Sequence, residues 1–161
     1  IWCAEQSKIN RYIPAVQHLF EDSNFTEKAE EAIGRQLPHD FFVATLVSSV
    51  ENGAEAIDIS DEQDVFGIER TPTDAFYFIG HEFIIYLLFH ALKDEKAFTE
   101  LNTWNITEGL AEYYLKQILG DTRFNIHEKY VSFFEQTNCQ KQLSAAVLYR
   151  KGLAFFADTD R

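Results

Sequence analysis

The sequence contains no methionine, only two cysteines and three prolines, and no internal repeat or low-complexity segment. Because methionine is absent even from position 1, we expect the chain to begin inside a longer reading frame. Cys3 and Cys139 could form one disulfide in an oxidising compartment, or remain two small buried side chains. Together these features favour an exported protein, either periplasmic or secreted.

Positive charge and long apolar runs are also scarce. The chain has 14 Lys and Arg against 26 Asp and Glu, which gives a net charge of -12. An acidic chain without a basic patch repels phosphate backbones, so we expect no nucleic-acid partner. No uninterrupted apolar run reaches the roughly 18 residues that a membrane span needs, so we expect no membrane-spanning segment. The most apolar stretch, residues 76–92, contains Gly80, His81, Glu82 and His90 and predicts a buried helix.

The composition that is present suits one domain, residues 1–161, because 46% of the residues are apolar and 15% are aromatic. Apolar residues recur at helical spacing through the first 36 residues. Strand-forming residues then occupy 41–50, 56–59 and 65–68. Three later helices are predicted, from Thr71 to about 93, from Thr107 as N-cap to Gly120, and from about 142 to 156. The order predicts a mainly helical α+β fold with a small sheet before the central helix.

A partial zinc-peptidase motif lies within the central helix. Residues 81–85 are His-Glu-Phe-Ile-Ile. The HExxH motif needs His at its first and fifth positions, one helical turn apart, so that both imidazoles face one metal ion. Here His81 and Glu82 are present, and Ile85 occupies the fifth position.

Other segments match the motifs of one family in the same order. They are Leu-Pro-His-Asp-Phe-Phe at 37–42, Phe-Gly-Ile-Glu-Arg at 66–70, Thr-Glu-Gly-Leu-Ala-Glu-Tyr-Tyr at 107–114, Tyr-Arg-Lys-Gly at 149–152 and Asp-Thr-Asp-Arg at 158–161. With residues 81–83, they resemble the glycyl aminopeptidase family of gluzincins, zinc peptidases that often carry a PDZ domain. GAMEN-type zinc aminopeptidases are more distant relatives of that family. The resemblance spans residues 37–161 and implies a thermolysin-like catalytic domain, preceded by a helical lead-in at 1–36.

The resemblance implies roles for particular residues. His81 and Glu108 stand at zinc-ligand positions, and Glu82 stands where a general base takes a proton from the zinc-bound water. Tyr149 stands where a phenol hydrogen-bonds the oxyanion of the tetrahedral intermediate. Glu69 stands where a carboxylate meets the free amino group of the substrate.

Glu112, one helical turn beyond Glu108, could hold a ligand in place. These residues also have simpler structural interpretations. Glu108 and Glu112 could be acids in the first turn of a helix, and Tyr149 could be a core aromatic. If the protein is instead a structural or interaction module, we expect that His81, Glu82 and Glu108 do not converge in space.

Ile85 decides the functional expectation, because its side chain cannot bind a metal. Two ligands rarely hold zinc tightly, so we expect zinc to bind weakly or not at all. We therefore expect a degenerate member of the family without normal peptidase activity, which binds a peptide or protein in the remnant of the cleft. The alternative is an active zinc aminopeptidase with a non-standard ligand set, completed by water or a remote His. His90 does not suit that role, because nine residues at about 100° each place it on the opposite helix face from His81.

Overall fold

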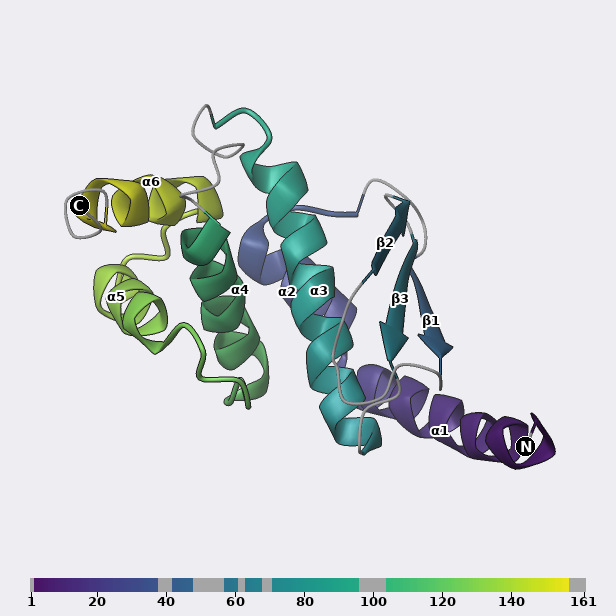
Figure 1. The fold of residues 1–161 in the computed structure, drawn as a ribbon. Helices are drawn as coiled ribbons and strands as arrows, with labels where there is room; N and C mark the ends of the chain where they lie inside the picture. The colour runs from purple at the N-terminus through teal and green to yellow at the C-terminus, as the bar shows by residue number, and fades with distance from the viewer. Residues whose placement is uncertain are drawn as a thin grey trace.

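The computed structural model describes residues 2–37, 42–47, 57–60, 63–67, 71–95 and 104–156. Within these ranges the chain forms six helices and three strands, so the protein is mainly helical with a small sheet, as predicted. Figure 1 shows helix α3 between the sheet on one side and helices α4, α5 and α6 on the other. The catalytic-domain topology implied by the family resemblance remains a prediction.

The chain begins with two helices, α1 (Trp2–Ser23) and α2 (Phe25–Ile33), separated by Asn24 in the left-handed conformation. Helix α2 is shorter than its apolar pattern predicted. Gly34, with φ of 74°, ends it, and its backbone N–H donates to the Glu30 carbonyl at 2.9 Å. A glycine there terminates the helix without the steric cost that a side chain would carry.

The sheet has three strands, β1 (Val43–Val47), β2 (Ile57–Ser60) and β3 (Gln63–Gly67), in the order β1-β3-β2. Strands β1 and β3 are parallel, and β2 pairs antiparallel with β3. Phe66 of β3 packs with residues of α1 and α3 in a small core cluster: Tyr12, Val16, Ala75, Phe78 and Ile79. The sheet is therefore anchored on α1 and the first half of α3.

Helix α3 (Pro72–Leu92) begins where the sequence predicted. The Thr71 hydroxyl accepts a hydrogen bond from the Asp74 N–H at 3.1 Å, and Pro72 occupies the first turn, where its missing N–H costs nothing. The helix is long and apolar enough to cross a membrane by length and composition, but 72% of its most apolar window is buried inside the protein. That burial is typical of the central helix of a packed core.

The second half of the chain forms α4 (Trp104–Leu119), α5 (Glu128–Asn138) and α6 (Ala145–Phe156). The prediction of Thr107 as the N-cap is wrong, because α4 begins three residues earlier and Thr107 lies buried inside it. Gly120, with φ of 81°, does end α4. The sequence did not predict α5, and Cys139 behind it is an exposed free thiol.

Candidate functional site

The centre of the candidate site is a contact between His81 on α3 and Glu108 on α4. His81 Nε2 lies 2.9 Å from Glu108 Oε2, and the two side chains are only 8% and 18% exposed. The residues are 27 positions apart in sequence, so only the packing of α3 against α4 brings them together. The structure thus joins the two residues that the motif resemblance placed at ligand positions.

The second ring nitrogen of His81 lacks a hydrogen-bond partner among the described residues. This nitrogen, Nδ1, is buried. The ring of Phe124, from the connection between α4 and α5, packs against the imidazole with centroids 5.7 Å apart. A buried polar atom without a partner costs free energy, so the Glu108 contact is the main polar interaction that holds this ring.

The electrostatic surroundings of His81 are acidic. Burial by itself would lower the pKa of the imidazole, but the hydrogen bond and charge of Glu108, with the charges of Glu82 and Glu112, raise it above its ordinary value. The raised pKa means that the protonated ring, which donates from Nε2 to the Glu108 carboxylate, is favoured more than in a free histidine.

Glu112 is buried on α4 and has a structural task. Its Oε2 accepts a hydrogen bond from the backbone N–H of His127, the N-cap residue of α5, at 3.2 Å. The His127 side chain makes no cap of its own, so Glu112 supplies the acceptor that this helix start needs. Its carboxylate contributes negative charge near His81 but is not its hydrogen-bond partner.

The remaining predicted site residues lie in different surroundings. Glu82 is half-buried on α3 and makes an interaction of its own. Tyr149 on α6 is fully buried within the main core cluster and also has a polar or ring contact. Glu69 lies outside the described residues, as do residues 38–41, 68, 70 and 158–161 of the matching segments.

The position of the missing ligand is filled with hydrocarbon. Ile85 is 3% exposed and belongs to the main core cluster together with Leu88 and Leu110. No group of three His, Cys, Asp or Glu side chains within the described ranges could hold a metal ion. A zinc-binding His also normally donates its second ring N–H to a partner, which His81 Nδ1 does not have here. The described residues therefore do not fit the ligand set of a zinc peptidase.

The described histidines do not replace the missing ligand. His18 lies exposed on α1, where it contacts Asp22 at 3.1 Å. His127 contacts the Tyr130 ring at the start of α5, and His90 lies nine residues beyond His81, on the opposite face of α3. His39, the remaining candidate, lies outside the described residues.

Sequence reasoning missed two features near α4. Phe124 covers His81, although a lone phenylalanine in a connecting segment carries no signal of that role. A cavity of about 700 Å³ is lined by α2, α4 and the connection between α5 and α6, and its lining does not include His81, Glu82 or Glu108. Its residues are dispersed over more than 100 positions of the sequence, so no local motif could reveal it.

Comparisons with protein-family models, with curated proteins and with solved structures found no match. The order of the sequence motifs and the geometry of the described residues are the features that point to a function.

Proposed function

We propose that this protein is a zinc-peptidase-like domain that has lost its metal chemistry and acts by binding a peptide or protein partner. The observation that carries the proposal is the 2.9 Å contact between His81 Nε2 and Glu108 Oε2. Two side chains at ligand positions of the resembled family meet across two helices, as they would around a metal ion. A structural module can also pair a buried His with a Glu, so the support lies in the coincidence of this pair with the two ligand positions of the resembled motifs.

The same contact explains how the fold tolerates the loss of zinc. A buried imidazole and a nearly buried carboxylate each need a polar partner. In a zinc peptidase the metal satisfies both groups, whereas here they satisfy each other. Ile85 then removes the third ligand and adds apolar packing in its place.

Activity without the second imidazole is disfavoured on chemical grounds. A catalytic zinc needs three protein ligands and one open position for water, so that the metal can lower the pKa of that water. Glu82 would have no activated water to deprotonate. Glu82, Glu108 and Glu112 make the surroundings of His81 acidic, which favours a positively charged group such as the amino terminus of a peptide over an anion.

The first experiment is elemental analysis of metal content after equilibration with zinc and dialysis. We expect far less than one zinc per chain, and no release of amino-terminal residues from aminoacyl substrates. Retention of about one zinc per chain, together with chelator-sensitive hydrolysis that Glu82→Gln abolishes, would establish the alternative of an active aminopeptidase.

A further inference from the structure

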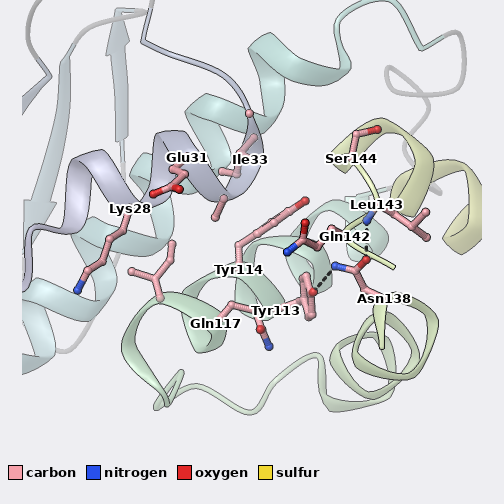
Figure 2. A pocket seen from close by; sticks show the side chains of 13 residues that line it. Lys28, Glu31, Ile33, Tyr113, Tyr114, Gln117, Asn138, Gln142, Leu143 and Ser144 are labelled. Atoms are coloured by element: carbon pink, nitrogen blue, oxygen red, sulfur yellow. Dashed lines mark hydrogen bonds between the residues drawn. The ribbon is translucent and has the colours of Figure 1, made fainter. Parts of the chain in front are cut away.

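The cavity of about 700 Å³ beside α4 lies away from the His81–Glu108 contact. Gln117, which lines it, follows Glu108 by nine residues, and at about 100° per residue it projects from the opposite face of α4. Figure 2 shows side chains from α2, α4 and the α5–α6 connection around this space. The volume is within the range of pockets that bind small ligands.

One wall of the cavity is fixed by hydrogen bonds. The Asn138 side-chain amide donates to the Tyr113 hydroxyl at 2.7 Å, and its oxygen accepts from the Leu143 N–H at 2.7 Å (Figure 2). In the same connection Gln140 and Gln142 adopt left-handed backbone conformations, with φ of 69° and 43°. Such conformations are unfavourable in residues other than glycine, and they persist where the surroundings enforce them. The wall is therefore held in place before any ligand arrives.

Tyr114 places an unused polar group in the lining. The residue is 3% exposed, and its hydroxyl is buried without a hydrogen-bond partner among the described residues. Burial, followed by the neighbouring Tyr113, raises the pKa of Tyr114 well above its ordinary value, so the hydroxyl stays protonated and can donate. Packing alone does not need this oxygen, because phenylalanine would fill the same volume without an orphaned group.

The exposed lining residues add complementary chemistry. Lys28 and Glu31 lie three positions apart on α2, and neither forms an ion pair within the part of the chain that the structure describes. They offer one positive and one negative charge at a single rim. Gln117 and Gln142 are exposed carboxamides, each able to donate to a carbonyl and accept from an N–H.

We propose that this cavity binds a short peptide with free termini. Its carboxylate contacts Lys28, its ammonium contacts Glu31, and its backbone amides pair with Gln117 and Gln142. The Tyr114 hydroxyl donates to a backbone carbonyl. This hydroxyl is closed off from solvent, so the contact requires a side chain of the lining to shift when the ligand enters. The proposal does not depend on the loss of zinc chemistry at His81.

A free amino acid carries the same two charges, but it has no peptide unit for the two carboxamides. The volume also exceeds what one amino acid would fill. We therefore expect a peptide to bind more tightly than a single residue does.

The test is binding of tri-alanine to the full chain, measured by isothermal titration calorimetry and by shifts of the backbone amide signals of Gln117, Gln142 and Ser144 in NMR spectra. We expect saturable binding below about 10 mM, weaker by about tenfold for N-acetyl-tri-alanine amide, in which both charges are blocked. Free alanine tests whether a single amino acid, rather than a peptide, is the ligand. Tighter binding of alanine than of tri-alanine, equal binding of the blocked peptide, or no saturation would overturn the proposal.

Single substitutions of the exposed residues Lys28 and Glu31 test the contribution of each charge to binding. Lys28→Gln and Glu31→Gln should each weaken tri-alanine binding by about five- to tenfold. Lys151→Gln and Glu128→Gln, exposed residues outside the lining, are the matched controls and should leave it unchanged. Unchanged affinity in both lining variants would contradict the proposed contacts.

Tyr114→Phe tests the buried hydroxyl. It should weaken tri-alanine binding while the unfolding midpoint stays the same or rises, because an unpaired buried group is removed. A raised midpoint with unchanged affinity would show that the hydroxyl contacts no ligand and would overturn this contact.

Discussion

Ile85 lies one helical turn beyond His81 on α3, so the two side chains share a face of the helix, yet they have different surroundings. His81 contacts Glu108 of α4, whereas Ile85 is buried among apolar side chains of the main core. The turn that would carry the second imidazole of an HExxH motif therefore contributes to packing. The isoleucine at this position thus excludes a metal ligand and adds to the core at the same time.

Ile85→His should raise the affinity for zinc by at least about tenfold, since it restores the second imidazole beside His81 and Glu108. It should also destabilise the metal-free protein by about 2–4 kcal/mol, because a polar ring replaces a packed hydrocarbon. Competition with a chromophoric chelator measures the affinity, and urea unfolding with and without zinc measures the stability. Zinc should recover part of the lost stability, because it binds only the folded chain.

The control for this prediction is the double variant Ile85→His with Glu108→Gln, which removes the proposed third ligand. Its zinc affinity should fall back toward that of the wild type. If a folded Ile85→His variant binds zinc no better than the wild type, the assignment of the motif is wrong.

Glu108→Ala should destabilise the protein by about 1–3 kcal/mol, because it leaves His81 with neither ring nitrogen paired. Glu108→Gln keeps an acceptor at the same place and should cost less. Urea unfolding at pH 6 of these variants, with exposed Glu128→Ala for comparison, checks the order. Equal stability of the Ala and Gln variants would show that the contact contributes little.

Asp74 makes the stability of the α3 start dependent on pH. The hydrogen bond from the Thr71 hydroxyl lowers the pKa of Asp74 most, burial opposes the shift, and Arg123 lowers the pKa further. The folded-state pKa is therefore below the unfolded value of about 3.8. The stabilisation is fully present above that value and is lost as the pH falls through the folded pKa.

The wild type should thus be more stable than Asp74→Asn near neutral pH, by no more than about 1 kcal/mol because the site is exposed to solvent. Urea unfolding of both proteins from pH 7 down to pH 3 checks this difference, which should shrink below about pH 4. A difference that stays constant over this range would contradict the assigned shift.

Gly109→Ala should destabilise the protein by about 2 kcal/mol or more, because the added methyl group would overlap the Cβ of Tyr130 where α4 meets α5. Gly80→Ala is the comparison, since its methyl group would meet only the end of the Phe25 ring, at 2.9 Å. Thermal unfolding of both variants should show the larger loss at Gly109. The close packing of α4 against Tyr130 therefore explains the glycine at position 109 without any role in a catalytic motif.

Local signals predicted the elements whose ends the chain itself specifies. Thr71, Pro72 and Asp74 begin α3, and the left-handed Gly120 ends α4, because caps and breakers act on their own backbone. Helix α5 escaped prediction because its N-cap residue makes no side-chain cap, and the acceptor for that backbone N–H comes from Glu112, 15 residues earlier.

The sequence by itself determined the mainly helical composition, the small sheet before the central helix, and the absence of a second motif histidine at Ile85. Only the tertiary structure decided that His81 meets Glu108, that Ile85 completes a core, and that Tyr114 lines a cavity on the opposite face of α4 from Glu108. The reason is physical. Periodicity and caps follow from the local backbone, whereas contacts across 27 residues or more depend on how the helices pack.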